Sequence, residues 1–398
     1  MIVPVLNRFL HWGAVGIISP VLVLLVMSKG VPVESVGLVL AFSSAIVVLL
    51  ELPSGVLSDL IGRRRVYLIS LLAGIASKAA IFLARGTLGL YVGFGLYGIS
   101  RAFSSGSIEA TYIDDYIARR GKEGLHKLIA AMSLGETAGL ALGCLAGGYI
   151  PSLWKRLAPA QNEYAGNLLA QILVLAALVV LTLATRYRDT GSSRVGLGRF
   201  IDESRRFLLE SRTLRLLLAG AAFWGISFNA IEVYWQPRLL ELAGEAEGSA
   251  PYGILNGGYF LAAALGSVLA GAIMARSSGC RRTKGSMALA GGLRVATGAS
   301  MIALSIQGGV PGFAVFYLAT MLLNGMMGVP ENTVFAAAVP ESKRASFLSL
   351  ASLTMQAGGI VGSLAFSAVK RFAPISAIWV AAGALFAASA ILYFRARE

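Results

Sequence analysis

The chain has 398 residues, of which 56% are hydrophobic and 14% charged, and its Lys and Arg outnumber Asp and Glu by 34 to 20, a formal net charge of +14. A soluble domain carries about 25% charged residues, and a soluble chain of this length needs a polar surface to meet water. The composition therefore argues against a soluble enzyme, a disordered protein and a nucleic-acid-binding domain. It favours a protein that crosses a membrane many times. Two cysteines and two scattered histidines suggest neither a disulfide framework nor a metal site.

Continuous apolar runs, each near the roughly 20 residues that a membrane helix needs, predict twelve transmembrane helices. Because these runs do not alternate between apolar and polar residues, barrel strands are not expected. The predicted fold is therefore all-α, with two pseudo-symmetric six-helix bundles. The spans lie at about 5–28, 35–57, 66–85, 88–111, 127–150, 165–185, 213–238, 251–275, 286–306, 311–333, 346–369 and 374–394.

The basic residues set the expected orientation. With the N-terminus inside, most Lys and Arg residues fall in cytoplasmic loops, as the positive-inside rule requires. Both termini are therefore expected in the cytoplasm, with the chain in the plasma (inner) membrane. The long polar stretch 186–212 is expected to be a cytoplasmic linker, which separates an N-terminal bundle, 1–185, from a C-terminal bundle, 213–398.

Two segments of the first half match the second half at nearly the same offset. Residues 133–143 resemble 352–362, and residues 55–64 more loosely resemble 271–282. The matches predict a duplicated six-helix unit, although glycine-rich membrane helices can also match by chance. Parallel repeats of this kind place a substrate site between the halves, near the middle of the bilayer.

The loop between the second and third spans has the spacing G-x-x-x-D-x-x-G-R-R, formed by Gly55, Asp59, Gly62, Arg63 and Arg64. Gly55 would let helices approach closely, and Gly62 would allow a tight turn. This pattern resembles the loop signature of the major facilitator superfamily. The resemblance implies that Asp59 and Arg63 belong to a cytoplasmic charge network that stabilises an outward-open state.

Acidic residues gather at the cytoplasmic end of the fourth span. Glu109 and Asp114, with Asp115 beside them, are close enough in the expected topology to meet Arg63 or Arg64. In the superfamily that the loop resembles, an acid at this place makes such a contact, so Glu109 and Asp114 are expected to belong to the gate. The alternative is that these carboxylates are simply hydrated.

The fifth span carries glycines at helical spacing, including Gly139, Gly143, Gly147 and Gly148. Such a face packs tightly and can slide or bend. It is similar to the fifth-span signature of the drug–proton antiporter branch, G-x-x-x-G-P-x-x-G-G, with Cys144 in place of the proline. The similarity implies proton antiport, and a plain packing face is the alternative.

Three ionisable residues within the spans are candidates for proton coupling. Arg101 lies in the fourth span, Glu136 in the fifth and Glu232 in the outer part of the seventh. Charged groups at such depth face a cavity or a partner, and a carboxylate there can take up and release a proton. Glu136 is the first candidate because it is deeper, and Arg101 is its expected partner. A structural ion pair for Arg101 and a vestibule position for Glu232 are the alternatives.

Polar and aromatic residues in the second half are candidate substrate ligands. The resemblance places spans one, four, seven and ten around the cavity, which selects Asn229, Trp235 and Asn324. Hydrogen bonds between helices are the alternative role for such residues. Lys78 and Arg294, within spans three and nine, are expected to pair or to extend toward the interface.

The sequence as a whole predicts a secondary active transporter that exports a small molecule by alternating access, in exchange for protons. Its partners would be the substrate, protons and the lipid bilayer, its energy source the proton gradient, and its working form a monomer without cofactor. An importer, symporter or uniporter on the same fold is the main alternative, and a membrane sensor is a weaker one. An ATP-driven pump is disfavoured because no P-loop sequence is present, and an enzyme because no cluster of catalytic groups is apparent.

Overall fold

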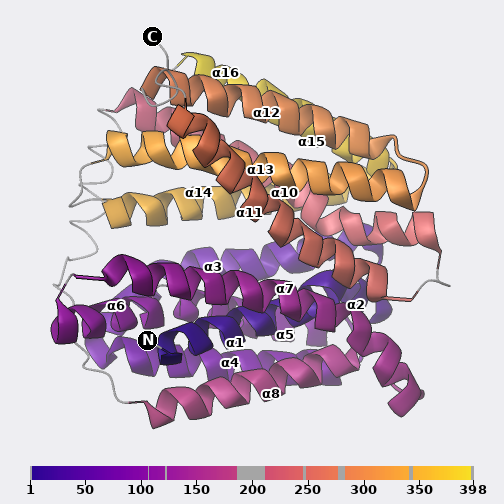
Figure 1. The fold of residues 1–398 in the computed structure, drawn as a ribbon. Helices are drawn as coiled ribbons and strands as arrows, with labels where there is room; N and C mark the ends of the chain where they lie inside the picture. The colour runs from indigo at the N-terminus through magenta and orange to yellow at the C-terminus, as the bar shows by residue number, and fades with distance from the viewer. Residues whose placement is uncertain are drawn as a thin grey trace. The chain divides into compact units, whose positions relative to one another are not determined.

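A computed structural model of the chain describes residues 2–105, 107–121, 123–185, 211–244, 248–276, 283–339 and 344–395. Within these ranges every regular element is a helix (Figure 1). Eleven of the helical segments are long and apolar enough to cross a membrane. The predicted class, an all-α protein with many membrane spans, is therefore confirmed.

The helices of the first half follow the predicted spans closely. They are α1 (Ile2–Ile18), η1 (Ser19–Val21), α2 (Leu22–Ser28), α3 (Val33–Ile61), α4 (Arg63–Leu83), α5 (Thr87–Ser104), α6 (Ser107–Arg120), α7 (Leu125–Leu157) and α8 (Ala165–Ala184). The short η1 turn contains Pro20, which lacks the backbone N–H that a continuous helix needs.

The fourth predicted span, 88–111, differs from the helices in the structure. It corresponds to α5, which ends at Ser104, followed by the separate helix α6. Helix α5 is not among the eleven membrane-spanning candidates, because Arg101 and several glycines lower the hydropathy of its 18 residues. Helix α6 carries Glu109 in its first turn and ends with Arg119 and Arg120, so it suits an aqueous interface.

The second half contains α10 (Arg212–Ala243), α11 (Ala250–Arg276), α12 (Thr283–Ser305), α13 (Val310–Ala338), α14 (Arg344–Lys370), α15 (Ile375–Ala388) and α16 (Ala390–Arg395). Ser211 caps α10, since its side chain accepts a hydrogen bond from the backbone N–H of Leu214. Apart from residues 211 and 212, the predicted linker 186–212 lies outside the described residues.

Contacts divide the chain into two units. Unit 1 comprises Met1–Pro32, Phe42–Arg194 and Ala246–Gly257, and unit 2 comprises Val33–Ala41, Val195–Glu245 and Gly258–Glu398. Most helices of residues 1–185 lie in unit 1, and most of those of residues 213–398 lie in unit 2. The exceptions are the first residues of α3, which pack with unit 2, and those of α11, which pack with unit 1.

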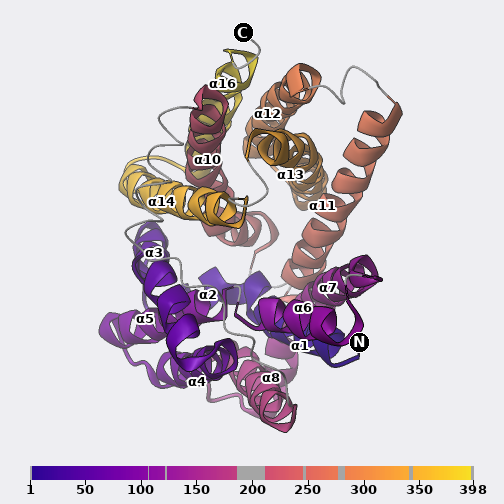
Figure 2. The same ribbon diagram turned by 90° about the vertical axis from the view of Figure 1, so that its left-hand side faces the viewer.

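The two units repeat the same helix packing. Helix α1 packs along α7 in unit 1, and α10 packs along α14 in unit 2 (Figure 2). Gly139 of α7 faces the carbonyl oxygen of Phe9, as Gly358 of α14 faces that of Ala222. These equivalent contacts support the duplication that the sequence suggests.

The distribution of side chains fits a lipid solvent. Leu49, Leu83 and Leu173 are each 72% exposed, whereas Asn7 and Asn167 are completely buried. Aliphatic side chains cost nothing against hydrocarbon, while polar groups must find partners inside the protein. Asn167 does so by donating to the carbonyl oxygens of Ile17 and Gly147, both at 2.8 Å. The chain is a multi-pass integral membrane protein.

Candidate functional site

An arginine held between two carboxylates joins three helices of unit 1. Arg8 of α1 donates from Nη2 to Glu136 Oε2 of α7 at 2.6 Å, and the same nitrogen lies 3.3 Å from Glu109 Oε2 of α6. The side chains of Arg8, Glu136 and Glu109 are 15%, 30% and 42% exposed. We call these three residues the Arg8 cluster. All three side chains are therefore partly exposed.

Close approach of the backbones brings this cluster together. A Cβ atom at Gly135 would lie 2.9 Å from the carbonyl oxygen of Val5, so α7 can approach α1 there only because residue 135 is glycine. Glu136 follows directly and Arg8 lies one helical turn beyond Val5, which places the two charges side by side.

Aromatic and polar groups of α1 and α4 surround the arginine. The Arg8 guanidinium carbon lies 5.6 Å from the ring centre of Trp12. Nearby, the Tyr67 hydroxyl lies 3.2 Å from both Asn7 Oδ1 and His11 Nδ1. Asn7 and Tyr67 are buried, so these hydrogen bonds fix the position of α1 against α4 beside the cluster.

The proton-coupling candidates are not arranged as the sequence suggests. The ion-pair partner of Glu136 is Arg8, not Arg101, which lies exposed in the last turn of α5. The expected contact between Arg101 and Glu136 is not among the contacts described for Glu136, and a role for Arg101 in proton coupling stays a prediction. Glu232 lies exposed on α10, in unit 2. Sequence reasoning missed Arg8 because it lies near the start of the first span, where a basic residue suggests an interfacial position.

The arginines after the glycine turn have defined partners in unit 1. Gly62 adopts a φ of +90° between α3 and α4, a conformation that favours glycine. Arg63 Nη1 donates to Asp114 Oδ2 at 2.7 Å. Arg64 donates to the carbonyl oxygens of Thr182 and Leu183, which lie at the unsatisfied carboxyl end of α8. The loop thus ties α4 to both α6 and α8.

Other predicted gate residues lie elsewhere. Glu109 pairs with Arg8 and not with the loop arginines, and Asp115 pairs with Arg119 at 2.9 Å. A Cβ atom at Gly55 would meet no atom within 4 Å, so the expected close helix approach at that glycine is wrong. Asp59 lies in α3, but its side chain is outside the described part of the structure.

The glycines of α7 serve two contacts within unit 1. Gly139, Gly143 and Gly147 face the backbone of α1, and a Cβ atom at Gly143 would lie 2.5 Å from the Gly13 carbonyl oxygen. Gly148 faces the first turns of α11, where a Cβ atom would lie 2.6 Å from the Cα atom of Gly253.

Cys144, at the proline position of the antiporter signature, takes part in the contact with α11. The thiol sulfur accepts a hydrogen bond from Asn256 Nδ2 at 3.3 Å, and the same amide donates to Ser19 Oγ at 2.7 Å. Both atoms are contributed by unit 1 residues that are distant in sequence. The residue at this position therefore holds helices together instead of bending one.

The three candidate substrate ligands make contacts between helices of unit 2. Asn229 donates to Ser363 Oγ at 2.8 Å, and Asn324 Oδ1 accepts from Trp224 Nε1 at 2.7 Å. The indole ring of Trp235 stacks on Tyr317 with ring centres 5.3 Å apart. These positions match the packing alternative, and a role in substrate binding stays a prediction.

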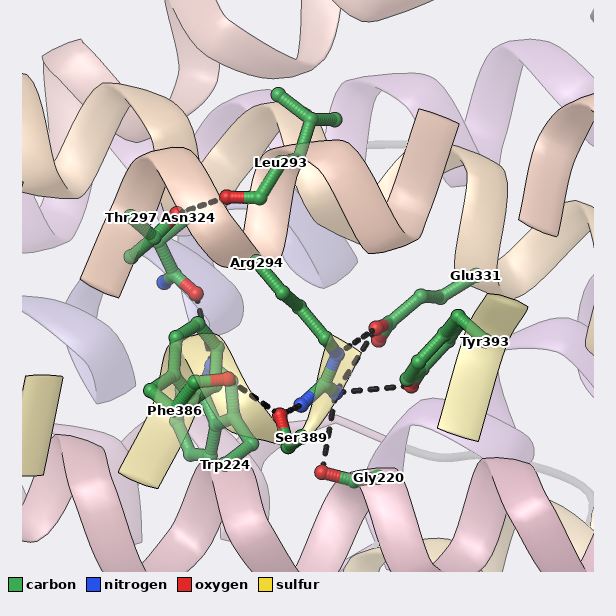
Figure 3. A network of polar contacts seen from close by, with 10 residues as sticks. All are labelled: Gly220, Trp224, Leu293, Arg294, Thr297, Asn324, Glu331, Phe386, Ser389 and Tyr393. Carbon is green, nitrogen blue, oxygen red and sulfur yellow. Dashed lines mark hydrogen bonds and ion pairs between the residues drawn. The ribbon is translucent and has the colours of Figure 1, made fainter. Parts of the chain in front are cut away.

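Arg294 is the centre of a second polar network (Figure 3). The residue is completely buried in α12 and binds Glu331 Oε1 through Nε and Nη2 at 3.0 and 2.9 Å. It also donates to Ser389 Oγ, Tyr393 Oη and the Gly220 carbonyl oxygen, at 2.9, 2.8 and 3.0 Å. Pairing, one of the two expected outcomes for Arg294, is therefore the one found.

Lys78, the other cation within a span, contacts an aromatic ring. Its Nζ atom lies 4.1 Å from the ring centre of Tyr97, and the side chain is buried. Among the residues that the structure describes, no group of three or more His, Cys, Asp or Glu side chains could hold a metal ion.

A known protein family matches most of this chain. The family profile described as Major Facilitator Superfamily matches residues 5–363. The chain belongs to the major facilitator superfamily. Membership explains why the loop signature around Gly62 and the repeated packing occur together.

Relatives within the superfamily are distant. The chain is 24% identical over 254 residues to an uncharacterized transporter of this type, YxaM of Bacillus subtilis (strain 168). The match covers 62% of this chain and 60% of the relative, so it spans about three fifths of that protein's length.

Solved structures share the fold over the whole chain. The nucleoside transporter NupG has a TM-score of 0.77 at 14% identity, covering 100% of this chain and 97% of NupG. A bacterial homologue of the human lysosomal transporter Spinster, in an inward-facing and unoccupied conformation, has a TM-score of 0.72 at 15% identity. That match covers 100% of this chain and 96% of the homologue. At such identities the likeness concerns the fold alone.

Proposed function

We propose that this transporter exports a small molecule in exchange for protons, as members of the drug–proton antiporter branch do. The Arg8 cluster carries the proposal, because it places two carboxylates around one arginine within a membrane protein. In this proposal the chain works as a monomer in the inner membrane, both termini are cytoplasmic, and the proton gradient supplies the energy without a cofactor.

The charges of the cluster give it a reason to bind one proton. When both carboxylates are ionised, one guanidinium balances only one of them, so the cluster carries a net charge of about −1 in a medium that disfavours unpaired charge. A proton on Glu136 makes the cluster neutral, with Arg8 then held by Glu109. A cationic substrate near Glu136 would neutralise the cluster equally well, which makes proton and substrate competitors.

Protonation would also change contacts between helices. Arg8, Glu109 and Glu136 belong to α1, α6 and α7, and the 2.6 Å ion pair is the shortest link among them. Losing it would loosen α7 from α1 at one end. The Arg63–Asp114 pair ties α4 to α6, and we assign it the part of a contact that forms in one conformation and breaks in the other.

The test is Glu136→Gln in proteoliposomes. A thermal-shift screen with amphipathic cations first identifies a ligand, since a ligand stabilises the fold that it binds. Uptake of that ligand is then measured under imposed pH gradients of both signs. We expect Glu136→Gln to lose the response to the gradient, while its exchange of ligand at equal pH continues.

Glu163→Gln is the matched control. Glu163 is also a carboxylate of unit 1 that pairs with a base, Lys155 at 3.8 Å, but the pair is largely exposed. The control should keep the full pH response. An unchanged pH response in Glu136→Gln would show that the proton is carried elsewhere.

Uptake of a nutrient or metabolite, by symport or facilitated diffusion, is the second candidate on the same fold. The same liposomes separate the two directions. Antiport drives the ligand against the direction of proton flow, whereas symport drives it along with the protons. A ligand that follows the protons into the liposomes would keep Glu136 as the coupling group and overturn export.

A further inference from the structure

Two neighbouring hollows lie in unit 1, on either side of the first turns of α1. The first, of about 390 Å³, is lined on one side by polar residues of α6, Tyr112, Asp115, Tyr116, Arg119 and Arg120, and otherwise by Ile2, Val3, Pro4, Leu128 and Thr185. The second, of about 530 Å³, runs between α1 and α7 and is lined only by apolar residues. Ile2 lines both hollows, so the two adjoin at this residue.

The polar hollow favours an anion. Its titratable lining residues are Asp115, Arg119 and Arg120, which together leave one positive charge in excess. Arg119 forms an ion pair with Asp115, in which Nη2 lies 2.9 Å from Oδ1. Arg120 lies over the Tyr116 ring, with 6.0 Å between the guanidinium carbon and the ring centre, and its side chain is exposed. Its guanidinium is therefore positioned to meet a ligand that enters from the membrane surface.

The apolar hollow favours hydrocarbon. Its walls are Val5, Leu6 and Phe9 of α1 and Leu134, Gly135 and Ala138 of α7. Gly135 lies against Val5 of α1, so the hollow is an open groove along the line where α7 meets α1, and Leu134 is 71% exposed beside it. A groove lined by apolar residues favours an apolar partner over water.

We infer that the two hollows together bind an anionic phospholipid. The head group would occupy the polar hollow against Arg119 and Arg120, and one acyl chain would lie in the apolar hollow between α1 and α7. The shared residue, Ile2, would mark the junction between head group and chain. A soluble anion fits only the first hollow, and a neutral lipid gains nothing from the arginines. The inference does not depend on proton coupling, because binding and not transport is its readout.

Native mass spectrometry of the full chain in detergent tests this inference. Dioleoyl phosphatidylglycerol and dioleoyl phosphatidylcholine are titrated separately, and the fraction of protein carrying lipid is measured. A basic residue near the head group contributes about a fivefold gain in binding of an anionic lipid. We therefore expect phosphatidylglycerol to bind about tenfold or more tightly than phosphatidylcholine, and Arg119→Gln/Arg120→Gln to abolish the difference.

The matched control removes two positive charges from the last turn of α7, whereas Arg119 and Arg120 lie at the end of α6. Lys155 and Arg156 are exposed and line neither hollow, so Lys155→Gln/Arg156→Gln should keep the preference. Arg120→Gln alone, which leaves the Arg119–Asp115 pair intact, should lose about half of it on a logarithmic scale. Its monodispersity in detergent guards against a folding defect.

A second arm tests the acyl chain. Ala138→Phe fills the apolar hollow and should weaken the binding of phosphatidylglycerol. Leu153→Phe, on an exposed part of the same helix, should leave this binding unchanged. Soluble glycerol 3-phosphate should compete poorly with phosphatidylglycerol for binding to the protein. Equal binding of the two lipids, an equal loss in the Lys155/Arg156 variant, or full competition by glycerol 3-phosphate would each overturn the lipid assignment.

Discussion

Arg294 shows how a single residue can be stable inside a membrane helix. All three of its guanidinium nitrogens donate to protein oxygens, and the ring of Phe386 lies 4.9 Å from the guanidinium carbon. Its charge is balanced by Glu331, so no unpaired charge is buried. Removing one partner of such a pair strands the other, which costs about 3–5 kcal/mol, whereas replacing both with apolar residues is close to neutral.

This arithmetic yields a prediction for Glu331→Leu. The variant should lose about 3–5 kcal/mol of unfolding free energy, measured by titration with SDS in mixed micelles. The double variant Arg294→Leu/Glu331→Leu should recover most of the loss. A double variant as unstable as the sum of its single variants would contradict the assigned pairing. Lys155→Ala/Glu163→Ala, which removes an exposed pair, should change stability by less than about 1 kcal/mol.

The Arg8 cluster differs from the Arg294 network in its exposure and its charges. The cluster is partly exposed and has two carboxylates around one arginine, whereas Arg294 is buried and paired with one carboxylate, Glu331. For this reason the proposed proton carrier is Glu136 and not Glu331. Both are carboxylates on membrane helices, so residue type alone does not separate them.

At the level of helices, glycine positions decide which elements touch. The Cβ atom of an alanine at Gly139 would overlap the carbonyl oxygen of Phe9, and a backbone atom cannot move aside as a side chain can. At Gly55 the same methyl group would meet nothing within 4 Å. One glycine is therefore required by packing, and the other is not.

Matched alanine substitutions test this difference. Gly139→Ala should lower the unfolding free energy by about 1–3 kcal/mol through overpacking of α1 against α7. Gly55→Ala should raise it by up to about 1 kcal/mol, since alanine favours a helix more than glycine does. Thermal unfolding in detergent reads both variants. Equal shifts of the same sign would show that α1 and α7 do not approach as closely as described.

At the level of the whole molecule, the chain's two halves exchange short segments. The residues Ala246–Gly257 belong to unit 1, where Ser249 donates to the Gly148 carbonyl oxygen at 2.7 Å. The residues Val33–Ala41 belong to unit 2, where Gly37 lies against Ser363 and Ser367 of α14. Each unit is therefore incomplete without a piece of the other half of the sequence.

This exchange predicts that two fragments of the chain, expressed as separate polypeptides, assemble into one complex. A chain cut within 186–210 and co-expressed as two fragments, one of them tagged, should co-purify as a complex. Gly253→Leu should greatly reduce the yield of complex, because a side chain there would meet the backbone of Cys144 and Gly148. Gly271→Leu, on the same helix with nothing within 4 Å, should leave the yield unchanged. Fragments that purify separately would refute the exchange.

The membrane fold and the family were readable from the sequence alone. Hydrocarbon forces each crossing segment to be apolar and helical along its own length, so the spans are written locally. The glycine turn at Gly62 and the Arg63–Asp114 pair were also within reach, because they join ends of neighbouring spans. The break after Ser104 was not, since Arg101 and the glycines of α5 give no sharp boundary.

Only the tertiary structure decided which charges meet. Arg8 and Glu136 are 128 residues apart, and their contact depends on how far α7 approaches α1 at Gly135. The rotation of each helix about its axis likewise directs Asn229 and Asn324 toward neighbouring helices. It also places Glu331 where it forms an ion pair with Arg294. Hydropathy determines whether a segment lies in the bilayer. The rotation and approach of a helix follow from packing against residues distant in the chain, which no local pattern records.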